Sequence, residues 1–153
     1  MAVDVLLSDR AEQQVSSLRA RDRKAYDAFV IQLRAQGCKA LKYRMTGNDP
    51  LGRLCVAHLI GPMRVVVAFE SEEIASIVLV GPHDNSDPFT DVYSRLYELI
   101  GLESPPESQR DKPPCCGSDD GLPPSVDAQT LEDLVKRARA LSGAAKRRAR
   151  RQI

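Results

Sequence analysis

Apolar residues recur at two different spacings along the chain, and the spacing changes at Gly37. Residues 3–7 form a short apolar run that predicts a first strand. Two helical stripes follow over residues 11–18 and 22–36, and Gly37 supplies a common helix stop. We therefore expect one strand and then a helical hairpin with one apolar face to bury.

After Gly37 the apolar residues recur at every second position, which is the spacing of strands. These runs are rich in β-branched residues, and turn-forming residues separate them. Gly61-Pro62 and Ser71-Glu72 are the expected hairpin turns, so the runs predict an antiparallel meander. The predicted strands cover residues 41–45, 53–60, 63–69 and 74–80.

An apolar stripe over residues 90–102 predicts an amphipathic helix after the last strand. The element order is then strand, helix, helix, four strands and helix. This order predicts an α+β fold in which helices cover one face of the sheet. A further short amphipathic helix is expected from residue 127 to about residue 142.

The 153 residues are enough for one compact domain with an appendage, and the charge distribution divides them. Residues 1–102 hold 12 Lys and Arg against 13 Asp and Glu, so the predicted domain is nearly neutral. Residues 103–125 are rich in Pro, Ser and acidic residues and predict a disordered linker. Residues 126–153 combine the helix with a basic tail that contains Lys146, Arg147, Arg148, Arg150 and Arg151.

The sequence predicts a cytoplasmic protein with no membrane partner. Nothing in it resembles an export signal, and no apolar run approaches the roughly 20 residues of a membrane span. Cys38 and Cys55 have apolar neighbours, which favours buried reduced thiols. Cys115-Cys116 lack the ligand spacing of a zinc site, so we expect no metal and no cofactor. We interpret these two cysteines either as exposed thiols with a redox role or as residues without a functional role.

Three side chains with phosphate-handling chemistry are expected near one end of the sheet. Arg64 alternates out of an apolar strand, His83 follows the last strand, and Tyr93 lies at the start of the helix after it. A cation, an imidazole and a phenol suit a phosphodiester substrate. Each also has a structural interpretation: an ion pair for Arg64, a loop hydrogen bond for His83 and core packing for Tyr93.

The turn at Gly61-Pro62 decides whether His58 joins these residues. A two-residue turn pairs Leu59 with Arg64 and puts His58 on the opposite face, because successive side chains alternate. A three-residue loop sets His58 opposite Arg64 instead. Gly followed by Pro suits a type II′ turn, so we expect the two-residue turn and a structural role for His58.

Three stretches carry motifs in a fixed order: residues 41–47, residues 63–69, and residues 80–83 followed by 92–93. They are similar to a Lys-Leu-x-Gly approach to a strand, a Tyr-Arg-Val-x-Tyr strand, and Val-Gly-x-Arg/His followed by Tyr. In this order the chain resembles the RelE/ParE superfamily of bacterial toxins over about residues 3–101. The resemblance implies two N-terminal helices and one C-terminal helix on a curved antiparallel sheet of four to five strands.

RelE-type members cut messenger RNA at the ribosome by attack of a 2′-OH on the adjacent phosphate. The resemblance implies that Arg64 contacts the phosphate, that His83 donates the proton and that Tyr93 orients or stacks on a nucleotide. It also implies a metal-independent endoribonuclease of a toxin–antitoxin system, with RNA or the ribosome and an antitoxin protein as partners. The alternative is a non-catalytic binding module on the same fold, either a DNA gyrase inhibitor or a degenerate toxin that serves as a scaffold.

Other basic residues are the expected contacts to RNA phosphates. RelE-type members usually carry two lysines on the strand before the arginine strand, and this chain has none there, which favours the non-catalytic alternative. Arg53 is expected on the face of Arg64, with Glu70 as its cross-strand partner. Three interpretations of the basic tail stay open: it binds RNA or the ribosome, it is a solvated terminus, or it folds against the acidic linker. The expected contacts are Lys42, Arg44, Arg53 and the five basic residues of the tail.

Overall fold

The described part of the chain forms a five-stranded sheet with helices on both sides. The computed structural model describes residues 2–45, 51–84, 86–87, 91–100, 114–116 and 122–137. In chain order the elements are β1 (Asp4–Leu7), α1 (Asp9–Ser16), α2 (Ala20–Gln36), β2 (Tyr43–Arg44), β3 (Leu54–His58), β4 (Met63–Ser71), β5 (Ile74–Pro82) and α3 (Val92–Ile100), followed by a helix over residues 128–137.

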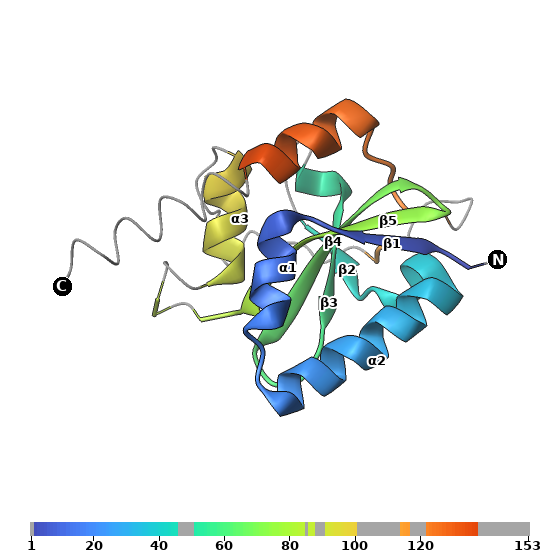
Figure 1. The fold of residues 1–153 in the computed structure, drawn as a ribbon. Helices are drawn as coiled ribbons and strands as arrows, with labels where there is room; N and C mark the ends of the chain where they lie inside the picture. The colour runs from blue at the N-terminus through green and yellow to red at the C-terminus, as the bar shows by residue number, and fades with distance from the viewer. Residues whose placement is uncertain are drawn as a thin grey trace.

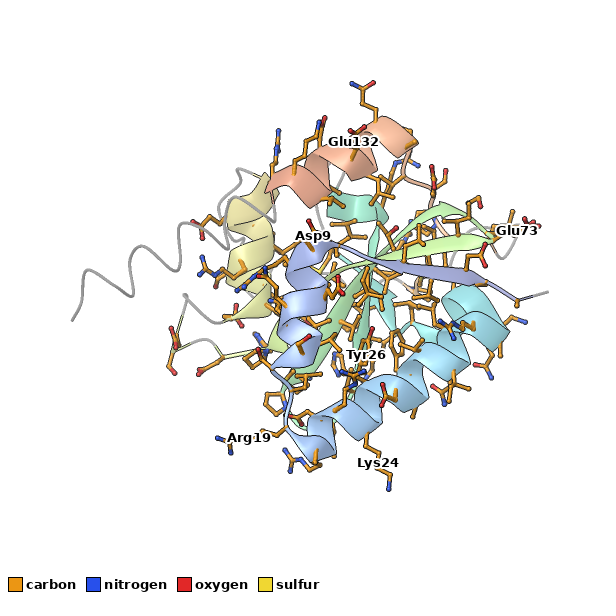
Figure 2. All side chains as sticks on the ribbon, in the orientation of Figure 1. Asp9, Arg19, Lys24, Tyr26, Glu73 and Glu132 are labelled. Atoms are coloured by element: carbon orange, nitrogen blue, oxygen red, sulfur yellow. A yellow bond between two sulfur atoms is a disulfide. The ribbon has the colours of Figure 1, made fainter. Side chains whose placement is uncertain are left out.

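The first strand and the helical hairpin lie where the spacing of apolar residues predicts them. Ser8 caps α1, because its Oγ accepts the backbone N–H of Ala11 at 3.0 Å. Gly37 ends α2 with a φ of 60°, a backbone conformation that favours glycine. Figure 2 shows Tyr26 pointing from α2 toward the sheet and Lys24 pointing away from it, as the amphipathic stripe requires.

The sheet is mixed, with strand order β1-β5-β4-β3-β2. The meander from β2 to β5 is antiparallel as predicted, but β1 runs parallel to β5 and pairs Asp4 with Ile74. The expectation of an all-antiparallel sheet is therefore wrong at this edge. Strands β1 and β5 share no hairpin, so no turn chemistry in the sequence sets their relative direction. The second hairpin turn also moves by one residue, since Ser71 pairs with Ile74 around Glu72 and Glu73.

Helices cover both faces of the sheet, so the expectation of one covered face is wrong. Val65 and Val66 are adjacent in β4, point to opposite faces and are both fully buried. A strand that is apolar on both sides needs a cover on each. One core lies under α1 and α2 and includes Phe29 and Leu33. The other lies under α3 and the helix over residues 128–137.

The segment after α3 packs on the sheet where the structure describes it. Val126, Leu131 and Leu134 are buried in the core beneath α3. The Val126 N–H donates to the carbonyl of Phe69 at 2.7 Å, beside a bridge between Phe69 and Ser125. In Figure 1 the strands lie between α2, below them, and this last helix, drawn in orange above them.

Two disulfides join this segment to the sheet domain. Cys38 bonds to Cys116 and Cys55 bonds to Cys115, with Cα atoms 5.9 and 5.7 Å apart. The interpretation of Cys38 and Cys55 as reduced thiols is therefore wrong, and so is the interpretation of the Cys115-Cys116 pair as exposed, since Cys115 is 2% exposed. Separations of 78 and 60 residues leave no local signal for the pairing.

Several predicted features lie outside the described residues. They are most of the acidic linker, at residues 103–113 and 117–121, and the chain from residue 138 onward with its basic tail. The division into domain, linker and tail stays a prediction for these parts. Among the helices that the structure does describe, none is long and apolar enough to cross a membrane.

Candidate functional site

The candidate site lies where β3, β4 and β5 end around the turn at Gly61-Pro62. Arg64 pairs with His58 on one side and with Gly81 on the other, so His58 shares its face. The predicted register, with Leu59 opposite Arg64, is wrong.

The turn itself explains the shift in register. Gly61 has a φ of 55°, and Met63 donates its N–H to the carbonyl of Ile60 at 3.1 Å, as a tight Gly-Pro turn requires. Leu59 also donates to the carbonyl of Met63 at 3.0 Å, so Leu59 and Ile60 together oppose one residue. This extra residue is a β-bulge. It lets Leu59 pack with the core under α1 and α2 while His58 faces the other way.

Asp91 holds His83 in one orientation. The Nδ1 of His83 lies 2.9 Å from Oδ1 of Asp91, and the same oxygen accepts the N–H of Asp84 at 2.7 Å. The other oxygen accepts the N–H and the hydroxyl of Ser94 at 2.8 and 2.9 Å. Burial acts to raise the pKa of Asp91, but these hydrogen bonds outweigh it and lower that pKa. The carboxylate is therefore ionised, and it holds the His83 ring through Nδ1.

Two tyrosines join His83 to His58. The ring of Tyr93 lies edge-on against His83, with ring centroids 4.7 Å apart. The hydroxyls of Tyr93 and Tyr43 are 2.7 Å apart, and the Tyr43 hydroxyl lies 3.2 Å from Nε2 of His58. Burial, and then the contact with Tyr43, raises the pKa of Tyr93, so its phenol stays protonated. A continuous set of contacts therefore leads from the imidazole of His58 through the hydroxyls of Tyr43 and Tyr93, and the ring of Tyr93 packs against His83.

Arg64 lies beside this chain of contacts. Its charge and a hydrogen bond from its guanidinium act on Tyr93 and partly oppose the rise in the pKa of that phenol. Its Nη1 donates to the carbonyls of Gly61 and Met63 at 2.9 and 3.1 Å. Its Nε is buried and has no hydrogen-bond partner in the described part of the chain. A buried donor without a partner carries a cost in free energy.

The other predicted RNA contacts do not gather here. Arg44 pairs with Cys55 and so lies on the opposite face of the sheet from Arg64. Arg53 precedes the far end of β3, where its Nη1 donates to the carbonyl of Ser125 at 3.0 Å. Lys42 is exposed beside β2. The basic residues of the tail, from 146 to 151, lie outside the described residues.

Sequence reasoning missed Tyr43, considered Asp91 only as an ion-pair partner of Arg64 and gave His58 the wrong face. Tyr43 had one usable signal, its alternation within a β-rich run. Asp91 stands directly before an apolar helical stripe and three residues before Ser94, which is the pattern of a helix N-cap. No signal at either position indicates a contact with a histidine far away in the sequence.

Comparison with protein-family models and with curated proteins found no match to this chain. The chemistry of the site therefore rests on its own side chains. It offers one guanidinium, two imidazoles and two phenols on one face at one end of the sheet. In the part of the chain that the structure describes, no group of three or more His, Cys, Asp or Glu side chains is placed to hold a metal ion.

Proposed function

We propose that this protein is a RelE-like endoribonuclease of a toxin–antitoxin system, which cleaves messenger RNA and is restrained by an antitoxin protein. One observation carries the proposal. The only two histidines of the chain reach the same end of the sheet, with Arg64 directly opposite His58 and the ring of Tyr93 against His83. Acid–base cleavage of RNA needs two proton-transferring groups and a cation at the phosphate.

The contacts support a role for each group. The 2′-OH of one nucleotide attacks the adjacent phosphate, and its proton passes to His58 through the Tyr43 hydroxyl. Arg64 neutralises the charge that develops on the phosphate oxygens. His83, held by Asp91, donates a proton to the leaving 5′ oxygen. The products are a 2′,3′-cyclic phosphate and a free 5′-OH, and no metal or water is consumed in this step.

The role of Arg64 rests on a guanidinium that the turn holds in place. The Arg64 side chain is only half-buried, so a phosphate oxygen approaches the accessible part of the guanidinium, and its negative charge then lies beside the two tyrosines. Since Nη1 is already held by two backbone carbonyls, the guanidinium is fixed before the substrate arrives.

A second candidate has its own support. Tyr93 is only 5% exposed, and the carbonyls of Gly61 and Met63 already occupy Nη1 of Arg64. These contacts also fit a non-catalytic module, of the kind that inhibits DNA gyrase or serves as a scaffold. The two functions differ in whether the 2′-OH of the RNA is required.

The test uses the purified full chain and an end-labelled RNA, both free and as messenger on ribosomes. We expect cleavage by the wild type, no cleavage when the nucleotide at the cut site is 2′-deoxy, and loss of at least a hundredfold in rate for His83→Ala. Lys24→Ala, on the face of α2 that points away from the sheet (Figure 2), should cleave like the wild type. Undiminished cleavage by His83→Ala, or no cleavage by the wild type in either assay, overturns the proposal. If the wild-type protein cleaves no RNA but inhibits DNA supercoiling by gyrase, the second candidate function is supported.

A further inference from the structure

The four large apolar side chains that are exposed in the described part of the chain gather around β1. Leu6 and Leu7 belong to this strand and are 53% and 39% exposed. Ile31 of α2 is 69% exposed and lines a hollow of about 360 Å³ together with Ala2. Leu122 lines a second hollow that also includes Ala2. Apolar side chains that gather on one exposed surface indicate an interaction site.

The strand β1 is also an open edge of the sheet. The strand order places it outside β5, and the N–H groups of Asp4 and Ser8 donate to β5. Backbone groups alternate in direction along a strand, so the N–H and C=O of Val5 and of Leu7 point away from the sheet. Within the described residues, no other strand pairs with this side of β1. An edge of this kind is a template for a further strand.

The opposite edge of the sheet is protected. There β2 is only two residues long, and the exposed Lys42 precedes it. Short strands and lysines are two of the features that keep sheet edges from pairing. By contrast, β1 contains no lysine, no proline and no bulge. Pairing through β1 therefore joins two copies of the chain and stops there, because the other edge does not continue the sheet.

A second copy of the chain fits the open edge in an antiparallel register. Residues that exchange hydrogen bonds across an antiparallel pair must both point toward the partner strand. Val5 opposite Leu7 of the second copy meets this condition twice around a twofold axis, and every outward N–H and C=O of β1 then has a partner. Leu6 lies on the axis opposite Leu6 of the second copy, in a pair without hydrogen bonds, where side chains approach most closely.

Registers shifted by two residues do not fit in this way. One of them uses Val3, whose N–H already donates to the carbonyl of Arg34 at 2.8 Å. The other uses Asp9, which is the first residue of α1. In the register with Leu6 on the axis, Asp4 lies opposite Ser8 of the second copy, so the acidic ends of the two strands do not face each other.

We propose that two copies of this chain associate through β1 as a twofold dimer in which their sheets become continuous. Stable interfaces bury roughly 1,200–2,000 Å² in total, and two paired strands of this length supply only part of that area. The apolar surface continues from β1 onto α2, because the Val3 N–H donates to Arg34 and Ile31 lies one turn before Arg34. Leu6, Leu7 and Ile31 supply the additional apolar contact.

The dimer leaves the candidate site accessible. β1 pairs with residues 74–77 at the start of β5, whereas the candidate site lies at the other end of β5, where Gly81 pairs with Arg64. The inference is therefore independent of the proposed function.

Sedimentation velocity of the full chain measures the association, at concentrations up to about 200 μM because interfaces of small area bind weakly. We expect a wild-type dimer and an increase of at least about tenfold in Kd for Leu6→Lys, which removes an apolar contact and sets two like charges opposite each other. Leu6→Glu should have the same effect. An equimolar mixture of Leu6→Lys and Leu6→Glu should recover the dimer, because position 6 faces itself across the axis.

Ala20→Lys is the matched control for an added surface charge. Ala20 is the exposed first residue of α2, next to Arg19 in Figure 2. It lies about 20 Å along the helix from Arg34, at the end of α2 away from β1. This variant should dimerise like the wild type. Thermal melting of each variant establishes that it is folded.

Hydrogen exchange tests the same contact in the wild type, without a substitution. The amides of Val5 and Leu7 should exchange more slowly as the protein concentration rises, since the dimer gives each N–H a partner. A wild type that stays monomeric over the whole range overturns the proposal, as does wild-type association by folded Leu6→Lys. Exchange at Val5 and Leu7 that does not depend on concentration, or no recovery in the mixture, shows that β1 does not pair in this register and overturns it as well.

Discussion

The hydroxyls of Tyr43 and Tyr93 lie 2.7 Å apart and join the edge strand β2 to the start of α3. The two residues are 50 positions apart in the chain. Tyr43 also contacts His58, and Tyr93 packs against His83. The contact therefore fixes the spacing between two imidazoles that come from opposite sides of β4.

Removing one of these hydroxyls should cost stability without opening a cavity. We expect Tyr93→Phe to lower the free energy of unfolding by about 1 kcal/mol, because it leaves the ring packed and removes a part-buried hydrogen bond. Urea unfolding of Tyr43→Phe, Tyr93→Phe and the double mutant should show a coupling of about 1 kcal/mol. Tyr26→Phe, on the other face of the sheet, is the control and should show no coupling with Tyr93→Phe. Strict additivity of the Tyr43 and Tyr93 changes would mean that their contact contributes nothing.

The carboxylate of Asp91 should make the fold sensitive to acid. Its pKa is lower in the folded protein than in the unfolded chain. The stability it contributes is therefore fully present above the unfolded value, near 4, and is lost as the pH falls through the lower folded value. Asp91→Asn should lower the free energy of unfolding by about 2 kcal/mol at pH 7 and flatten its decline below pH 4.

Urea unfolding between pH 2.5 and pH 7 measures this effect. Asp27→Asn, an exposed side chain on α2 that pairs with Arg23, is the control for removal of one carboxylate. The assignment to Asp91 fails if both variants keep the acid dependence of the wild type.

Secondary-structure elements were predictable from the sequence where a local signal sets them. Predictions failed where contacts between distant segments set the structure. Ser8 and Gly37 mark the ends of helices with their own side chain or backbone, so the helical hairpin was predictable. Arg64, His83 and Tyr93 were expected near one end of the sheet, and the structure brings them there. The face of His58 was not predictable from the Gly-Pro turn, because the bulge at Ile60 depends on which residues the two cores can accept.

The two disulfides should hold the segment around residue 115 to the sheet domain. Reduction by dithiothreitol should lower the free energy of unfolding by several kcal/mol, since the Cys55–Cys115 bond alone closes a loop of about 60 residues, worth about 4 kcal/mol by loop entropy. The double variant Cys55→Ser, Cys115→Ser should lose part of this free energy of unfolding. Reduction of the double variant should then lower its stability less than reduction of the wild type.

Thiol titration checks the bonds directly. The unreduced protein in denaturant should show no reactive thiol, and the reduced protein should show four. Four reactive thiols before reduction would contradict both bonds. Disulfides are rare in reducing compartments, so the same titration on protein taken directly from cells tests the predicted cytoplasmic location.

The bulged turn before Arg64 should depend on Gly61. Its φ of 55° is a conformation that other residues rarely adopt, and an added Cβ would meet no atom within 4 Å, so the cost of Gly61→Ala is backbone strain alone. We expect a loss of about 1–2 kcal/mol in the free energy of unfolding. Gly61→Asn, which introduces a residue that adopts a positive φ more readily than Ala, should lose less stability and serves as the control. Because the turn sets the register of His58 against Arg64, any active Gly61→Ala protein should lose cleavage rate as well as stability. Equal stability of the two glycine variants would show that the strain at Gly61 is absent and that another contact holds the register.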